Sequence, residues 1–220
     1  MKMDLFFVIL CVTLPLVFLI RLAFLLGTLW NNRRTNTNIL SDVSTTSAHL
    51  MAVLGSGGHT KELLVFLSVL GPKLSPRSFI VAESDHLSVD KIRQQQKESQ
   101  DINYEIFKLP RSREIHQSYL SSIFTSIKAL MFAVPLVIRV KPDILLVNGP
   151  GTCVPVLFTC FLMKYLYISQ IKIVYIESIC RVTSLSLSGK LAYYLVDSFV
   201  VQWPDLTRRY SMASYVGRLL

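Results

Sequence analysis

The chain lacks the features that mark most cofactor-dependent enzymes and secreted domains. Its four cysteines follow no metal-binding or disulfide spacing, so we expect neither a structural zinc nor a disulfide framework. No Asn-x-Ser/Thr acceptor occurs, which disfavours a lumenal domain. Walker, kinase and serine-hydrolase motifs are missing, and so is the Gly-x-Gly-x-x-Gly of dinucleotide-binding proteins. We therefore expect no metal and no cofactor.

The longest apolar run lies near the N-terminus, over residues 5–30, and is broken by Pro15 and Arg21. As a helix it would extend roughly 39 Å at ~1.5 Å per residue, more than the ~30 Å hydrocarbon core of a bilayer. A cleaved signal peptide is the competing interpretation, but its apolar core is typically ~7–15 residues long and no Ala-x-Ala site follows. We predict a retained transmembrane anchor over residues 1–30.

Charges around the anchor predict its orientation. Arg33 and Arg34 follow the apolar run, whereas Lys2 and Asp4 precede it. The positive-inside rule then places the bulk of the chain in the cytoplasm. Residues 31–48 are rich in Asn, Thr and Ser and indicate a linker. Residues 49–220 would form the folded domain.

Acidic residues are scarce beside basic ones: 14 Asp and Glu stand against 23 Lys and Arg, a formal net charge of +9. For a cytosolic domain held at a membrane, this balance suits anionic headgroups or a phosphorylated substrate. Nucleic acid is a less suitable partner, because of the anchor and because no dense run of Lys and Arg occurs.

After the linker, short apolar segments alternate with longer helical ones. We expect strands at residues 50–54, 78–82, 104–109, 144–147, 171–176 and 198–201, and helices at 60–70, 86–98, 118–140, 153–167 and 185–195. This alternation predicts an α/β fold, a Rossmann-like doubly wound parallel sheet of order 3-2-1-4-5-6 with helices on both faces. The apolar segments 127–140 and 154–168 favour buried helices; the alternative is an apolar face resting on the bilayer.

Two glycine-rich turns follow the first and fourth predicted strands, in Gly55-Ser-Gly-Gly-His-Thr60 and Asn148-Gly-Pro-Gly-Thr152. In this topology they would face each other across the switch point of the sheet. Glycine lets the backbone approach a ligand, helix N-termini favour anions, and His59 could take a proton from a hydroxyl. A turn that merely needs Gly and Pro is the alternative at 148–152. The candidate ligand-binding residues are Gly55, Ser56, Gly57, Gly58, Thr60, Asn148, Gly149, Gly151 and Thr152.

Charged residues follow two more strands at the same edge. Arg111 and Arg113 come after the third strand and could bind a diphosphate, with a solvated loop as the alternative. Glu177 and Arg181 come after the fifth strand and could orient a hydroxyl and bind a phosphate. A structural salt bridge between them is the competing interpretation.

The motifs together resemble one family. They are Gly-Ser-Gly-Gly-His-Thr-Lys-Glu at 55–62, Pro-Arg-Ser-Arg-Glu at 110–114, Asn-Gly-Pro-Gly-Thr-Cys-Val-Pro at 148–155, Glu-Ser-Ile-Cys-Arg-Val at 177–182, Leu-Ser-Leu-Ser-Gly-Lys at 185–190 and Val-Gln-Trp-Pro at 201–204. This set resembles the membrane-anchor subunit of the dolichol-pathway UDP-N-acetylglucosamine transferase. The first motif is also similar to that of the bacterial MurG glycosyltransferases.

The resemblance implies the acceptor-binding, N-terminal half of a split GT-B glycosyltransferase, inactive alone. A separate soluble subunit would bind UDP-GlcNAc, and the pair would add the second GlcNAc to GlcNAc-diphosphate-dolichol at the cytoplasmic face of the endoplasmic reticulum. His59 would be the base or the orienter of the acceptor hydroxyl, the glycine-rich turns would hold the acceptor sugar or its diphosphate, and the arginines would contact the diphosphate. We expect the apolar terminus at 215–220 to dock on the partner. The alternatives are a membrane scaffold for a self-sufficient transferase and, less favoured, a dinucleotide-dependent reductase.

Overall fold

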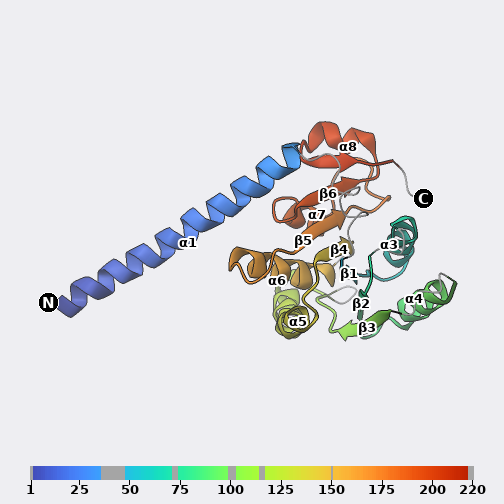
Figure 1. Cartoon of the computed structure of the whole chain (residues 1–220), viewed down its shortest axis with the longest axis horizontal. Helices are drawn as coiled ribbons and strands as arrows, with labels where there is room; N and C mark the ends of the chain where they lie inside the picture. The colour runs from blue at the N-terminus through green and yellow to red at the C-terminus, as the bar shows by residue number, and fades with distance from the viewer. Residues whose placement is uncertain are drawn as a thin grey trace.

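The computed structural model describes residues 2–35, 48–70, 74–98, 103–113, 117–149 and 151–217. A long helix leads into an α/β domain (Figure 1). The strands are β1 (Leu50–Val53), β2 (Arg77–Ala82), β3 (Tyr104–Leu109), β4 (Ile144–Asn148), β5 (Lys172–Ile176), β6 (Ser198–Val201) and β7 (Ala213–Tyr215). The helices are α1 (Lys2–Thr35), α3 (Gly58–Val69), α4 (His86–Glu98), α5 (Tyr119–Val140), α6 (Cys153–Tyr165), α7 (Leu187–Ala192) and α8 (Pro204–Arg209).

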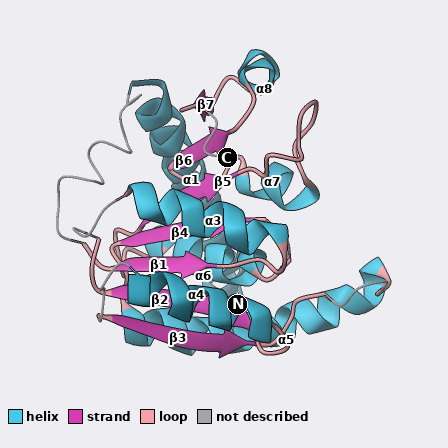
Figure 2. Ribbon diagram, turned by 90° about the vertical axis from the view of Figure 1, so that its right-hand side faces the viewer, coloured by secondary structure: helices cyan, strands magenta, loops and turns pink. Residues whose placement is uncertain are grey.

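The strands form one parallel sheet in the order β3-β2-β1-β4-β5-β6-β7 (Figure 2). This confirms the predicted doubly wound α/β fold, and the six predicted strands agree with the observed ones to within one residue at each end. The chain order reverses between β1 and β4, which pair directly, with Val53 opposite Val147. Residues that follow these two strands therefore meet at one edge of the sheet.

Helices cover both faces of the sheet, with α3 and α4 on one face and α5 and α6 on the other (Figure 1). The alternation of side chains along β1 supplies both cores. Met51 and Val53 join the cluster that includes α5 and α6, whereas Leu50 and Ala52 join the cluster of α3 and α4. Because both faces are covered, the strands are nearly continuous apolar runs.

Helix α1 extends away from the domain for much of its length (Figure 1), and it contacts α6. The Tyr165 hydroxyl donates to the Phe18 carbonyl at 2.9 Å, the Arg21 guanidinium lies 4.1 Å from the centre of the Tyr167 ring, and Leu29 is buried in the core. Over Cys11–Asn32, α1 is long and apolar enough to cross a bilayer.

The structure corrects several predicted boundaries. Residues 31–35 continue α1 instead of starting the linker, since neither Gly nor Pro interrupts the helix there; residues 36–47 lie outside the described residues. The helix predicted at 185–195 covers only Leu187–Ala192. It ends there in a turn, in which the N–H groups of Leu195 and Val196 both donate to the Ala192 carbonyl. Helix α8 and strand β7 were not predicted from the sequence, since each is too short to show a period.

Candidate functional site

The two glycine-rich turns meet at the carboxyl edge of β1 and β4. Nδ1 of His59, in the first turn of α3, lies 2.9 Å from Oδ1 of Asn148, the last residue of β4. Gly149 makes this contact possible, because it has a φ of +90° and a Cβ there would stand 2.6 Å from His59 Nδ1. The predicted convergence of the two turns is therefore present in the structure.

The first turn leaves backbone donors accessible at the start of α3. Gly57 is the N-cap residue, with a φ of +71° and no capping side chain. A Cβ at Gly57 or Gly58 would meet no atom within 4 Å, and Ser56, Gly57 and Gly58 are exposed. Uncapped N–H groups at a helix start favour an anion, so this turn can hold a phosphate.

The structure places Thr60 away from the crevice. The side chain is fully buried, and its hydroxyl bonds the Gly55 carbonyl and, at 2.6 Å, the Ser88 hydroxyl. Ser88 in turn donates to Asp85. Thr60 thus ties the glycine turn to the start of α4, and its burial argues against the predicted contact with a ligand.

Behind His59 lies a chain of buried polar side chains. Asn148 Nδ2 donates to Glu62 Oε2 at 2.9 Å, and the Ser178 hydroxyl donates to Glu62 Oε1 at 2.9 Å. Asn148, Glu62 and Ser178 come from β4, α3 and the segment after β5, and all three are buried. Sequence reasoning did not select Glu62 or Ser178; the available signal was that Glu62 stands three residues after His59, on the same face of the helix.

The two arginines after β3 reach the two turns. Arg111 Nη2 donates to the Ser56 hydroxyl at 3.1 Å. The Cβ of Arg113 lies 3.7 Å from the position that a Cβ on Gly151 would take, and its guanidinium donates to the Gln117 carbonyl at 3.0 Å. Arg111 therefore reaches the first turn, and the backbone end of the Arg113 side chain lies beside the second; their contact with a diphosphate stays a prediction. Thr152, half-buried, is the N-cap of α6 and makes no capping bond with its side chain.

Glu177 is buried inside the segment that links β5 to α7 and does not face a ligand site. Its carboxylate accepts from the Ser178 and Ser186 N–H groups, each at 3.0 Å, and from the Ser186 hydroxyl at 3.1 Å. Burial raises the pKa of Glu177 above its usual range, and the hydrogen bonds from Ser186 and Ser178 oppose this shift. Arg181 is exposed on the same segment. Glu177 therefore holds the segment in place, closer to the structural alternative than to a substrate contact.

In the described part of the chain, the cysteine beside the second turn is buried, and no cluster of metal ligands forms. No three His, Cys, Asp or Glu side chains come together there in a metal-binding arrangement. Cys153, which follows the second turn, is buried, and burial raises the pKa of its thiol to about 12. The groups that the structure brings to the crevice include His59, the backbone N–H groups of the α3 start and Arg111.

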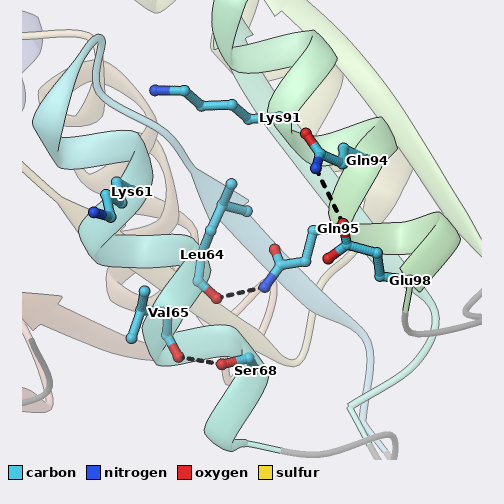
Figure 3. Close-up of a pocket in the computed structure, with 8 residues that line it drawn as sticks. All are labelled: Lys61, Leu64, Val65, Ser68, Lys91, Gln94, Gln95 and Glu98. Carbon is cyan, nitrogen blue, oxygen red and sulfur yellow. Dashed lines mark hydrogen bonds between the residues drawn. The ribbon is translucent and has the colours of Figure 1, made fainter.

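A separate groove of about 370 Å³ lies on the outer side of α3 and α4 (Figure 3). Lys61 and Lys91 border it, and Gln95 spans it by donating to the Leu64 carbonyl at 2.7 Å. It lies along the helices on one face of the sheet and does not include the two glycine-rich turns.

The fold and the crevice define a class: a Rossmann-like α/β domain of the kind that forms one half of GT-B proteins. The crystal structure of Acinetobacter baumannii MurG superposes with a TM-score of 0.52 at 14% identity, covering 71% of this chain and 42% of MurG. A UDP-N-acetylglucosamine 2-epimerase superposes with a TM-score of 0.50 at 16% identity, covering 71% of this chain and 40% of the epimerase. The chain thus spans less than half the length of either protein, and these likenesses concern the fold alone.

The chain belongs to the family described as oligosaccharide biosynthesis protein Alg14 like, whose model matches residues 50–219. Relatives named UDP-N-acetylglucosamine transferase subunit ALG14 confirm the membership. The rat protein is 46% identical over 181 residues and the human protein 43% over 181, each alignment covering 79% of this chain and 84% of the relative. The Schizosaccharomyces pombe protein is 43% identical over 173 residues, covering 77% of this chain and 82% of the relative.

Proposed function

We propose that this chain is the membrane-anchoring, acceptor-binding subunit of a UDP-GlcNAc transferase that adds the second GlcNAc to GlcNAc-diphosphate-dolichol in N-glycan precursor synthesis. A soluble subunit binds UDP-GlcNAc, and this chain recruits it to the endoplasmic reticulum. The observation that carries the proposal is the crevice where His59 meets Asn148 beside an uncapped helix start. The relatives' name, which describes a transferase subunit, supports the division of labour.

The crevice residues suit transfer to a lipid-linked sugar diphosphate. His59 accepts the proton of the attacking acceptor hydroxyl as the new bond forms between that oxygen and C1 of GlcNAc. The bond from C1 to UDP breaks, and UDP leaves with its electron pair. The α3 start and Arg111, which reaches Ser56, hold the acceptor diphosphate. The transferase chemistry therefore needs this chain and not only the partner.

The same proposal places the chain in a single-pass orientation with its domain on the cytoplasmic side. Arg33 and Arg34 follow the apolar part of α1, as the positive-inside rule requires. The net charge of +9 favours the anionic cytoplasmic leaflet. Because Tyr165 of α6 contacts Phe18 of α1, insertion of α1 brings the end of α6 into contact with the bilayer.

Helix α5, which packs on α6, presents an apolar stripe that extends this membrane contact. Its members recur every three, four or seven residues and therefore share one face of the helix. They are all exposed: Leu120, Phe124, Ile127, Met131 and Ile138. Lys128 and Arg139, both exposed, flank the stripe and can reach headgroups. The stripe begins beside the Arg113 loop, so it can guide a lipid tail away from the crevice.

A reconstitution assay tests the proposed function. With vesicles that contain a GlcNAc-diphosphate polyprenol, we expect no GlcNAc transfer from UDP-GlcNAc by this chain alone and none by the soluble partner alone. The two together should transfer GlcNAc, because each supplies half of the site. If the partner alone transferred GlcNAc as fast as the two subunits together, the result would support the scaffold alternative. Activity of this chain alone would overturn the split-enzyme proposal.

The α5 stripe predicts a dependence on the lipid part of the acceptor. Replacing Phe124 and Met131 with Glu, at positions 77% and 71% exposed, should lower transfer to a long-chain acceptor in vesicles about tenfold. Transfer to a short-chain, water-soluble acceptor should stay within about twofold, since no insertion is needed. Val69→Glu, at the end of α3 on the other face of the sheet, is the matched control. Equal losses with both acceptors would assign the stripe to the partner subunit instead.

A further inference from the structure

We infer that Glu62 is a positioning residue that acts through Asn148 to hold His59 in the one tautomer able to accept a proton at Nε2. The inference rests on the proposed function, because it assumes that His59 is the base. It adds two residues, Glu62 and Ser178, to which the sequence motifs gave no role. Three hydrogen bonds connect the side chains of His59, Asn148, Glu62 and Ser178, and in each of them one atom must donate and the other must accept.

The carboxylate sets the orientation of the amide. A carboxylate oxygen accepts hydrogen bonds, so the Asn148 atom 2.9 Å from Glu62 Oε2 is the donating Nδ2. The Ser178 hydroxyl donates to the other oxygen, Oε1, at 2.9 Å. Turning the Asn148 amide over would point Oδ1 at the carboxylate and lose that bond inside a buried site. Glu62 thus holds Asn148 with Oδ1 toward His59.

The amide in turn sets the imidazole tautomer. Asn148 Oδ1 is an acceptor without a proton, so the His59 nitrogen 2.9 Å from it must carry the hydrogen. In the neutral ring the lone pair is then on Nε2. The ring atoms nearest to a Cβ placed on Gly149 would be Nδ1, Cγ and Cε1, so the Nδ1 edge faces β4 and Nε2 belongs to the opposite edge. The proton-accepting atom is therefore free of the protein contact that orients the ring.

The arrangement also favours the protonated ring that forms during transfer. When Nε2 accepts the hydroxyl proton, the imidazolium keeps its Nδ1–H bond to Asn148, and the Glu62 charge lies one amide away. A buried carboxylate interacts with such a charge more strongly than an exposed one, since little water screens it. Glu62 therefore contributes to orientation and to charge stabilisation without contacting the acceptor.

The test is a swap of the amide and the carboxylate in the two-subunit enzyme, with kcat and KM measured separately. In Glu62→Gln the new side chain can donate as well as accept, so the Asn148 amide can turn over; we expect kcat to fall about tenfold or more. Asn148→Asp places two carboxylates together and should also lose kcat. Combining both changes restores a donor at 62 and an acceptor at 148, and should return kcat to within about threefold of the wild type.

A second background separates positioning from a purely structural role. If Glu62 acts through His59, Glu62→Gln should change kcat by less than about twofold once His59→Ala is present. A structural role would lower kcat by the same factor in both backgrounds and would overturn the inference. Glu98→Gln is the matched control, because Glu98 is exposed at the end of α4, beside the groove of Figure 3. If His59→Ala itself had no effect, the proposed function of His59 would fail; if only Glu62→Gln had none, this inference alone would fail.

Discussion

Replacing His59 with Ala should lower kcat for GlcNAc transfer about 10²-fold or more in the reconstituted two-subunit enzyme. General bases contribute roughly 10²–10⁴ to a rate, and His59 is the proton-accepting side chain that the fold brings to the junction of β1 and β4. The measurement is the initial rate at saturating UDP-GlcNAc and acceptor. KM for the acceptor should change much less, because the backbone N–H groups of the α3 start remain.

Two controls accompany the His59 prediction. His86→Ala removes an exposed imidazole at the start of α4 and should leave the rate within about twofold of the wild type. Co-purification of the partner with the His59→Ala chain shows that recruitment is intact. A rate that stays near the wild type while recruitment is unchanged would support the scaffold alternative, in which this chain only carries the partner to the membrane.

The sheet could be predicted from sequence because its strands are buried on both faces. Such strands are short apolar runs, and helical segments separate them; the strand order 3-2-1-4-5-6 is then that of the doubly wound class of sheets. Strand β7 and helix α8 escaped prediction because Ala213–Tyr215 and Pro204–Arg209 are too short to show a period. Their positions depend on tertiary contacts, such as the Met212 N–H that donates to the Tyr193 hydroxyl.

The sequence was sufficient to locate the candidate site, but not to assign a role to each of its residues. Glycine and His at the end of β1 indicated a crevice, because the topology fixes where that turn lies. The sequence did not distinguish Thr60, which is buried against α4, from Ser56, which is exposed. Glu62 and Asn148 are 86 positions apart, so their hydrogen bond is a property of the folded chain and has no local pattern. Only the folded structure therefore shows which polar residues of a motif support the site and which are exposed to a ligand.

The role of Glu177 also could not be assigned from the sequence. Its surroundings depend on Gly189, which the sequence places inside a predicted helix without indicating a contact with Glu177. Gly189 lies in α7 over the carboxylate, and a Cβ there would stand 2.2 Å from Glu177 Oε2 and 2.9 Å from the Ser186 hydroxyl. Those two atoms cannot move freely, because Glu177 accepts from Ser186 and Ser186 caps α7 through the Gly189 N–H.

Gly189→Ala should therefore destabilise the domain by about 2 kcal/mol or more, although Ala is intrinsically better than Gly in a helix by ~1 kcal/mol. For a chain of this size we expect the Tm to fall by roughly 4–8 °C in thermal unfolding of the detergent-solubilised full chain. Gly58→Ala, where a Cβ meets no atom within 4 Å, is the control for that same stability measurement and should stay within about 1 kcal/mol.

The cause of that loss can be isolated by removing the carboxylate first. Glu177→Ala alone should lower the Tm, because the N–H groups of Ser178 and Ser186 lose their acceptor. Adding Gly189→Ala to that variant should then cost little or nothing, since the new methyl group occupies the space that the carboxylate has left. If the two losses instead add in full, the clash with Glu177 is not what excludes a side chain at position 189. The loss of stability on Gly189→Ala would then come from the α7 backbone itself.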